Sequence, residues 1–367
     1  MAPAFPVEEY QAHMDRASAP EHLYYFGGYD AHTHFSQQAL VFAADGGDPT
    51  LVIRDVDVPP GAGDLWFGDV RPYRYGGDDP VAIMADVARE KGIAGRIGLD
   101  LQSYAVPGSF ALALIDALAP AEAVDATDTI GGLRVVKSAR EMALMREAGR
   151  YAEVGRAALL DAIAEGVTEN ALAGAVDFAM RAAGSSYPAM PTWLASGPRT
   201  TIGHFTPANR SLARGDPVGF ETAGVADRYH ALTIETCALG DPGDRVRQAH
   251  AAATAALLAG AEACIVGDPV SRAEVATTAV LEKAGFGGLP IMRFGYGIGA
   301  AYPLSWLEPL HIIRESDRPF EAGMTFCLHV RFSLPDEGFG IIVGGTYALT
   351  EGGLERLAGS DAEMRVL

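Results

Sequence analysis

A change in the hydrophobic pattern near residue 131 divides this sequence into two parts. Before it, short apolar runs alternate with turn clusters and with one clear helical pattern. Asp79 is predicted to cap that helix, since Asp is a favoured N-cap residue. Pro80 then occupies the first helical position, which suits proline. Strands that alternate with helices predict a small α/β domain over residues 1–131. Its predicted strands are residues 39–44, 50–53 and 95–100, and its predicted helix is residues 79–92.

The second part, residues 132–367, begins with paired amphipathic helices and ends in apolar strands. Ser138 followed by Glu141 is a capping-box pattern, which predicts a helix continuing to about residue 165, and Ser271 opens a second such pattern. Paired helices followed by mostly antiparallel strands predict an α+β domain. The other predicted helices are residues 168–183 and 244–263, and the predicted strands are residues 218–224, 231–239, 291–296, 324–332 and 340–349.

Charge and hydrophobicity narrow the classes of partner. The 367 residues are 49% hydrophobic, which excludes intrinsic disorder as the main state. Lys and Arg number 28 against 47 Asp and Glu, so the net charge is −19. A surface this acidic repels phosphate backbones and anionic lipids. We therefore expect no nucleic-acid or membrane partner, and a small molecule as substrate.

The cysteines and the lack of long apolar runs indicate the cellular location of the protein. The three cysteines are widely spaced and form no CxxC pair, which indicates reduced thiols rather than a disulfide framework or a zinc site. The first residues lack the basic and apolar regions of a signal peptide. No apolar run reaches the ~18–20 residues of a membrane span. We expect a cytoplasmic protein.

Residues 295–300 (Gly-Tyr-Gly-Ile-Gly-Ala) match the glycine pattern of dinucleotide-binding sites. That function needs a helix directly after the glycines, to hold the pyrophosphate at its N-terminus. Pro303 follows closely and argues against such a helix. The glycines are better explained as positions where the backbone approaches a pocket.

Glu221 is the strongest candidate for a catalytic side chain, because it interrupts the apolar strand predicted at residues 218–224. A buried carboxylate needs a partner or a task, and burial raises its pKa toward the range of a general acid or base. The alternative is a salt bridge with Arg228 or Arg199. His204, on a loop before that strand, is either structural or catalytic. The other candidates, each of which alone also fits packing, are Tyr229, His230, Glu235, Tyr302, Trp306, Glu308 and His329.

Taken in order, these segments resemble the creatinase/prolidase family, whose catalytic domain has the pita-bread fold. The resemblance implies an α+β pita-bread domain over residues 132–367, preceded by a creatinase-type α/β domain that is shortened at its start. It also implies a homodimer in which Tyr29, Asp30, His32 and His34 are candidates for a lid over the partner's site. The segments that carry the resemblance are residues 136–141, 212–218, 320–326 and 349–357.

Peptidase members of this family hold two metal ions with two Asp, one His and two Glu side chains. The resemblance places these five positions at Glu221, Leu232, Tyr296, His329 and Gly344. Leu and Gly side chains cannot ligate a cation, and one carboxylate with one imidazole leaves too few ligands for two ions. We therefore expect neither a metal nor another cofactor.

Metal-free members, creatinase and above all ectoine hydrolase, are more similar in detail. Residues 294–299 with Trp306 and Glu308 resemble the ectoine-hydrolase pocket, as do Glu221 with residues 228–231. Glu235 stands where an arginine is usual and Gly344 where creatinase has a carboxylate, which suggests a different substrate. The implied function is metal-independent hydrolysis of a C–N bond (amidine, guanidine-like or amide) in a small polar metabolite. The alternatives are a lyase and a catalytically inactive pita-bread binding protein.

The resemblance and the residue chemistry together imply the following roles. Glu221 attacks the substrate carbon or activates a water, and His204 moves the proton to the leaving nitrogen. Tyr296 and His329 donate hydrogen bonds to developing charge. Substrate binding is expected from Tyr302 and Trp306 as an aromatic wall, from Glu308 or Glu235 as partners of an amino group, and from Tyr229, His230, Tyr29 and Asp30.

Overall fold

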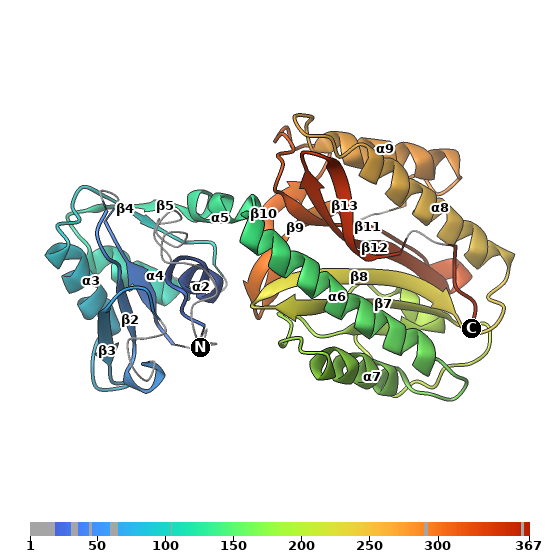
Figure 1. Cartoon of the computed structure of the whole chain (residues 1–367), viewed down its shortest axis with the longest axis horizontal. Coiled ribbons are helices and arrows are strands. Elements are labelled where there is room, and N and C mark those ends of the chain that lie inside the picture. The colour runs from blue at the N-terminus through green and yellow to red at the C-terminus, as the bar shows by residue number, and fades with distance from the viewer. Residues whose placement is uncertain are drawn as a thin grey trace. The chain divides into compact units, whose positions relative to one another are not determined.

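The computed structural model describes residues 19–30, 36–43, 46–58, 65–103, 105–289, 293–360 and 363–367. His32, His34 and the start of the N-terminal domain lie outside these residues. The chain forms two compact units, Met1–Arg134 and Val135–Leu367 (Figure 1). In the part of the chain that the structure describes, no helix is long and apolar enough to span a bilayer.

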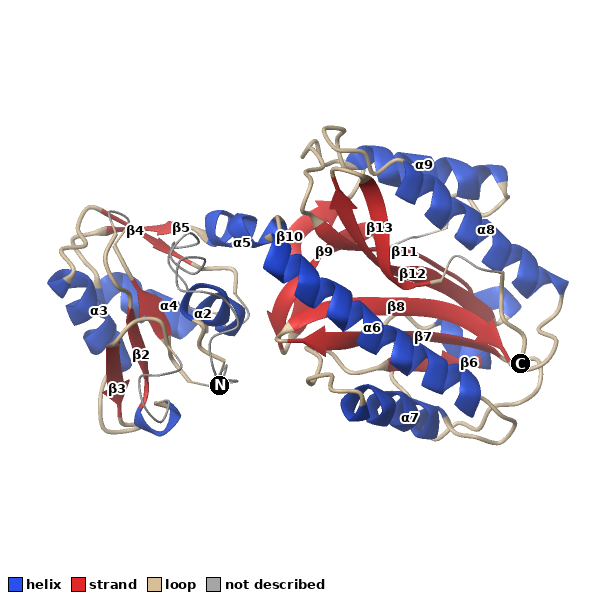
Figure 2. Cartoon of the chain, viewed as in Figure 1, coloured by secondary structure: helices blue, strands red, loops and turns tan. Residues whose placement is uncertain are grey.

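The first unit is an α/β domain, as predicted (Figure 2). A three-stranded sheet has the order β1-β2-β3, with β1 antiparallel and β3 parallel to β2, and β4 pairs β5 in parallel. Asp79 caps α3 as predicted, since its carboxylate accepts a hydrogen bond from Val81 N at 2.9 Å. The elements are α2 (Pro20–Gly27), β1 (Ala39–Val41), β2 (Thr50–Arg54), η1 (Asp55–Asp57), β3 (Asp69–Tyr73), α3 (Pro80–Glu90), β4 (Arg96–Leu99), α4 (Gly108–Ala117), β5 (Glu122–Asp125) and α5 (Thr127–Val135).

The second unit is built on an eight-stranded sheet of antiparallel pairs, in the order β10-β9-β11-β12-β8-β7-β6, with β13 also paired to β12. This confirms the predicted α+β domain. Its helices are α6 (Ala139–Ala162), α7 (Glu169–Ala182), α8 (Asp244–Glu262) and α9 (Ser271–Lys283), with the short η3 (Gly197–Thr201) and η4 (Pro335–Glu337). Its strands are β6 (Trp193–Ser196), β7 (Pro217–Ala226), β8 (Tyr229–Ala238), β9 (Gly295–Tyr302), β10 (Ser305–Ile312), β11 (Thr325–Leu334), β12 (Phe339–Thr350) and β13 (Gly353–Gly359).

Helix starts show where local sequence decides and where it does not. Ser138 and Glu141 form the predicted capping box at the start of α6. The capping box predicted at Ser271 is wrong. Ser271 is the first residue inside α9, and the N-cap is Val270, which makes no side-chain cap. A side chain already inside the helix is not placed to accept from the third helical N–H.

Strand alternation decides which side chains face the helices. In β7, Val218 and Phe220 belong to the apolar cluster under α6 and α7, and Gly224 allows α6 to come close. A Cβ at Gly224 would lie 2.2 Å from Ala148 O on α6, so no larger residue fits. The intervening position, Glu221, therefore projects from the opposite face of the sheet.

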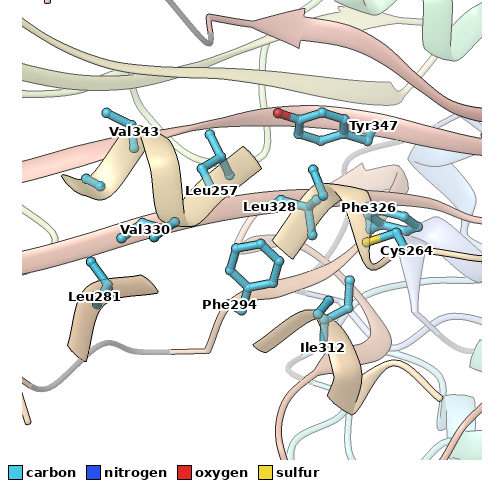
Figure 3. Packing of buried hydrophobic residues seen from close by; sticks show 14 of the residues in the cluster. Leu257, Cys264, Leu281, Phe294, Ile312, Phe326, Leu328, Val330, Val343 and Tyr347 are labelled. Atoms are coloured by element: carbon cyan, nitrogen blue, oxygen red, sulfur yellow. The ribbon is translucent and has the colours of Figure 1, made fainter. Parts of the chain in front are cut away.

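The same alternation holds in the other half of the sheet. Leu328 and Val330 of β11 and Val343 of β12 pack with Leu257 of α8 and Phe294 in a continuous apolar core (Figure 3). The residues between them on β11 and β12 face away from the helices. The two helix pairs thus cover one face of the sheet, and the other face is left for a site.

The segment after residues 295–300 differs from what its composition indicates. Residues 302–309 are rich in aromatic residues and proline, which is typical of a loop, but Tyr302 ends β9 and Trp306 lies on β10, which pairs antiparallel with β9. Gly and Pro pointed to a loop, whereas the chain turns tightly between two strands. No helix follows the glycines, in agreement with the rejection of a dinucleotide site.

Candidate functional site

A cavity of about 90 Å³ opens on the face of the sheet away from the helices. It combines charged, aromatic and apolar side chains from β6, β7, β9, β10, β11 and β12 and from the loop before β7. Its size suits a small metabolite rather than a large ligand. The lining residues are Met190, Trp193, His204, Phe205, Glu221, Arg293, Tyr296, Trp306, Leu307, His329, Arg331 and Ile342.

Glu221 stands at one end of a hydrogen-bonded chain in this pocket. The Tyr296 hydroxyl donates to its Oε1 at 3.3 Å, and Trp306 Nε1 donates to the Tyr296 oxygen at 3.3 Å. Burial raises the pKa of the Glu221 carboxyl to about 7, against the opposing effect of the Tyr296 bond. Burial also raises the pKa of Tyr296 well above its usual value, so it stays a protonated donor. Glu221 is thus poised to exchange a proton near neutral pH.

The pKa values of the two histidines of the pocket are both lowered. Burial, together with the charges of Arg293 and Arg331, lowers the pKa of His329 to about 4. Burial and the same arginines also lower the pKa of His204. The His204 ring lies edge-on to Trp193, with 4.6 Å between centroids, and its φ of 52° is a conformation that non-glycine residues rarely adopt. An imidazole in an unusual backbone conformation at a pocket fits a proton-transfer role.

Three polar atoms in the pocket are buried without a partner among the described residues. They are the ring nitrogens Trp193 Nε1 and His329 Nδ1, and Arg331 Nε. Sequence reasoning missed Trp193, Arg293 and Arg331. Arg331 follows His329 at strand spacing, so alternation on β11 was a usable signal for it. Trp193 and Arg293 come from segments whose neighbours are set by the sheet order, which local patterns do not reveal.

Four of the predicted residues therefore meet in the pocket as catalytic candidates, Glu221, His204, Tyr296 and His329, and Trp306 joins them. Three substrate-binding candidates on β8 do not. The Tyr229 hydroxyl donates to Glu141 on α6 at 2.9 Å. His230 Nε2 accepts from Ala189 N at 2.9 Å, and burial lowers its pKa to about 4.

The third of these β8 residues, Glu235, faces α6 and pairs with Arg156 at 3.1 Å and with Arg365 at 3.8 Å. Its position in the strand alternation puts it on the helix side of the sheet. Glu235 of β8 therefore does not supply an acidic partner for a substrate amino group in this pocket.

Two further candidates of the second unit, Glu308 and Tyr302, do not line the pocket. Glu308 forms a buried ion pair with Lys137, and the Tyr302 ring lies 4.9 Å below the Arg228 guanidinium. Tyr29 belongs to the first unit, where its hydroxyl donates to Asp57 O at 3.1 Å, and Asp30 is an exposed residue of the same unit.

The residues at the five metal positions do not fit a metal centre. Of the side chains at these positions, the Glu221 carboxylate and the His329 imidazole could each ligate a cation. The phenol of Tyr296 stays protonated, and Leu232 offers no ligand. Position 344 has no room for a ligand either, since a Cβ on Gly344 would lie 2.4 Å from Leu328 O. Within the described ranges, no group of three or more His, Cys, Asp or Glu side chains is arranged to hold an ion.

Comparison with known proteins agrees with this architecture. Residues 143–351 match the model for metallopeptidase family M24, and residues 17–136 match the creatinase/prolidase N-terminal domain. The ectoine hydrolase of Halomonas elongata is 27% identical over 368 residues, covering 93% of this chain and 89% of that protein.

Solved structures show the same fold over nearly the whole chain. The dipeptidase PepE of Mycobacterium ulcerans is 27% identical with a TM-score of 0.84, covering 99% of both chains. A recombinant prolidase from Thermococcus sibiricus is 20% identical with a TM-score of 0.88, covering 100% of both chains. With its pita-bread domain and its creatinase-type N-terminal domain, this chain belongs to metallopeptidase family M24, a family of hydrolases.

Proposed function

We propose that this M24 protein is a metal-independent hydrolase that cleaves a C–N bond in a small polar metabolite. Its relative, the ectoine hydrolase, is named for the hydrolysis of a small metabolite. The observation that carries the proposal is Glu221: a pocket carboxyl with a pKa of about 7, held by Tyr296 at a position where metal-dependent relatives are expected to have a ligand. Burial of this kind brings a carboxyl pKa into the range in which a general base works near neutral pH.

The proposed reaction is a simple hydrolysis. Glu221 takes a proton from a water molecule, and the hydroxide adds to the amidine or amide carbon. The C–N bond then breaks, and the leaving nitrogen receives that proton from Glu221 directly or through His204. Direct attack by Glu221 on the carbon, followed by hydrolysis, is the alternative order of events.

Tyr296 and His329 are suited to stabilise charge during this reaction. The Tyr296 phenol remains protonated at physiological pH, and the ring of His329 has an unpartnered Nδ1, which is a donor in the tautomer that carries its proton there. Fixed donors that face developing charge in a water-poor site contribute strongly to catalysis. Trp306 supports this arrangement by donating to the Tyr296 oxygen.

A peptide is the second candidate substrate. It is favoured by the 27% identity with a dipeptidase over 99% of both chains. That activity has to be reconciled with the missing ligands at positions 232 and 344. The homodimer and the lid role of Tyr29 and Asp30 stay predictions.

The test is mass spectrometry of products after incubation of the EDTA-treated protein with ectoine, related cyclic amidines and N-acyl diamino acids. The proposal expects a product one water heavier than its substrate. Fragments formed without added water would indicate a lyase instead. Cleavage of Xaa-Pro dipeptides only after manganese or cobalt is restored would show a conventional peptidase and overturn the proposal.

A further inference from the structure

One wall of the pocket is a segment that lies outside every helix and strand. Residues 183–192 connect α7 to β6, and they bring Met190 to the pocket just before Trp193 of β6. In the part of the chain that the structure describes, residues 188–191 make no backbone–backbone hydrogen bond. Side chains of neighbouring elements therefore have to hold residues 188–192, here called the wall segment, against the sheet.

His230 of β8 supplies a contact in the middle of the wall segment. Its Nε2 accepts from Ala189 N at 2.9 Å, and its Nδ1 lies 2.6 Å from Arg228 O. A carbonyl oxygen can only accept, so Nδ1 carries the ring proton and Nε2 is left as the acceptor. Burial lowers the pKa of His230 to about 4, which keeps the ring uncharged at neutral pH. Both ring nitrogens are thus used in one tautomer and one orientation.

The same ring also packs beside the donors that lead to Glu221. His230 is fully buried, and its ring centroid lies 6.5 Å from that of Trp306, within the range of aromatic contacts. Trp306 donates to the Tyr296 oxygen, and the Tyr296 hydroxyl donates to Glu221. One imidazole therefore supports two sides of the pocket, the wall segment through a hydrogen bond and Trp306 through packing.

A second contact fastens the end of the wall segment. The Thr192 hydroxyl donates to Asp177 Oδ1 on α7 at 2.6 Å and lies 2.9 Å from the Thr222 hydroxyl on β7. Thr192 directly precedes β6, so these bonds fix the start of that strand. His230 instead holds the residue directly before Met190. Loss of the His230 bond is therefore expected to free Met190 while β6 stays in place.

We propose that His230 is a positioning residue for substrate binding, which holds Met190 of the wall segment in place and so sets the width of the pocket. This role rests on the proposed function, because it takes the pocket as the substrate site. His230 was expected from the sequence to bind substrate, and it lies outside the pocket lining. A methionine side chain is flexible, so the position of its backbone decides how closely it contacts a small ligand.

The test compares three full-length variants. His230→Phe keeps a ring beside Trp306 but removes the acceptor, whereas His230→Gln keeps a side-chain acceptor for Ala189 N. His250→Phe is the matched control, because His250 of α8 is also buried, its pKa is also lowered to about 4, and it lies outside the pocket lining. Amide hydrogen exchange at Ala189 and the ¹⁹F signal of Trp193 labelled with 5-fluorotryptophan are measured, and neither needs a substrate.

In His230→Phe, amide exchange at Ala189 is expected to become about tenfold faster, the factor that one hydrogen bond provides, and the Trp193 signal should shift. His230→Gln should restore most of the protection, and His250→Phe should change neither readout. On a substrate found by mass spectrometry, His230→Phe should raise KM about tenfold and change kcat less than about threefold, because a binding wall rather than a reacting group is disturbed.

Unchanged exchange at Ala189 in His230→Phe, an equal change in His250→Phe, or no restoration by His230→Gln would overturn the positioning role. A loss of kcat at constant KM would overturn it too, since His230 would then act on the reaction itself. If no candidate substrate is hydrolysed but exchange at Ala189 follows the expected order, the proposed reaction fails and the positioning of the wall segment by His230 stands.

A measurement on the unmodified protein covers the case in which His230→Phe does not fold. ¹⁵N NMR of labelled histidine rings distinguishes the two tautomers, and the signals of His230 are those missing in His230→Gln. A neutral ring protonated at Nδ1 at pH 6 is the expected result. The opposite tautomer, or a charged ring at that pH, would remove the acceptor for Ala189 N and overturn the proposal.

Discussion

Glu169 and Glu221 are two buried carboxylates of the same unit with opposite environments. Glu169, at the start of α7, accepts from Ser196 N at 2.8 Å, Ser196 Oγ at 2.7 Å and Ala208 N at 3.0 Å, and it pairs with Arg199. Within the described ranges, Glu221 accepts one hydrogen bond, from Tyr296. The comparison teaches that burial alone does not mark a catalytic carboxylate. What distinguishes Glu221 is that its surroundings leave its charge unsatisfied beside a cavity.

The two residues also act on the same site in different ways. Glu169 fixes both ends of the segment that carries His204, through Ser196 before it and Ala208 after it. Glu221 instead faces the space where a substrate would lie. One carboxylate is therefore expected to hold the site together, and the other to perform the chemistry.

The largest expected effect is on turnover. Glu221→Gln keeps the shape and the Tyr296 contact but removes the base, and we expect the rate to fall on the order of 10³-fold. Steady-state kinetics on a substrate found by mass spectrometry checks this. Glu147→Gln, which changes a carboxylate of α6 outside the pocket, serves as the matched control and should keep its rate. A Glu221→Gln enzyme with near-normal turnover would remove Glu221 from the mechanism.

For Glu169, the main expected effect is on stability rather than on turnover. Glu169→Ala leaves Arg199 and two backbone N–H groups without their acceptor, and the free energy of unfolding should fall by about 3–5 kcal/mol. Urea denaturation followed by circular dichroism measures this. Stability close to that of the unmodified protein would show that the network around Glu169 contributes little.

A smaller effect is expected at the donor that holds Glu221. The Tyr296 bond lowers the Glu221 pKa, so Tyr296→Phe should move the acidic limb of the pH–rate profile to higher pH and lower the rate about tenfold. Tyr151→Phe is the control, because the Tyr151 hydroxyl also donates to a carboxylate, Glu147, but away from the pocket. An unshifted acidic limb in Tyr296→Phe would separate Tyr296 from the titration.

The last prediction concerns stability as a function of pH. A carboxyl whose pKa is raised in the folded state, as that of Glu221 is to about 7, favours folding below its ordinary pKa and loses that contribution as pH rises through about 7. Glu221→Gln should therefore gain stability relative to the unmodified protein between pH 5 and pH 8. Thermal unfolding at both pH values tests it, and a constant difference would contradict the raised pKa.

Much of the fold was predictable because it is encoded locally. The Asp79 cap, the Ser138 capping box and most of the predicted strands follow from short-range patterns and were confirmed. The strand predicted at residues 291–296 is displaced, since β9 runs from Gly295 to Tyr302. The capping box predicted at Ser271 failed because a side chain caps a helix only when its residue directly precedes the first helical residue. α9 begins at Ser271 itself, one position earlier than the pattern requires.

The site was less predictable. Glu221 could be singled out because it interrupts an apolar strand, whereas Glu235 was misleading, since only the pairing of β7 and β8 shows that it faces α6. Trp193 and Arg293 reach the pocket from segments far apart in the chain. Sheet order, rather than local sequence, brings such residues together.

The most direct test of the account is the titration of Glu221 itself. We would label glutamate side chains with ¹³C at Cδ, follow their NMR shifts with pH, and assign Glu221 from the signal missing in Glu221→Gln. A midpoint near pH 7 in the unliganded protein is the predicted result. A midpoint near the usual glutamate value of about 4.3 would mean that Glu221 is an ordinary carboxylate, and the proposed base would be contradicted.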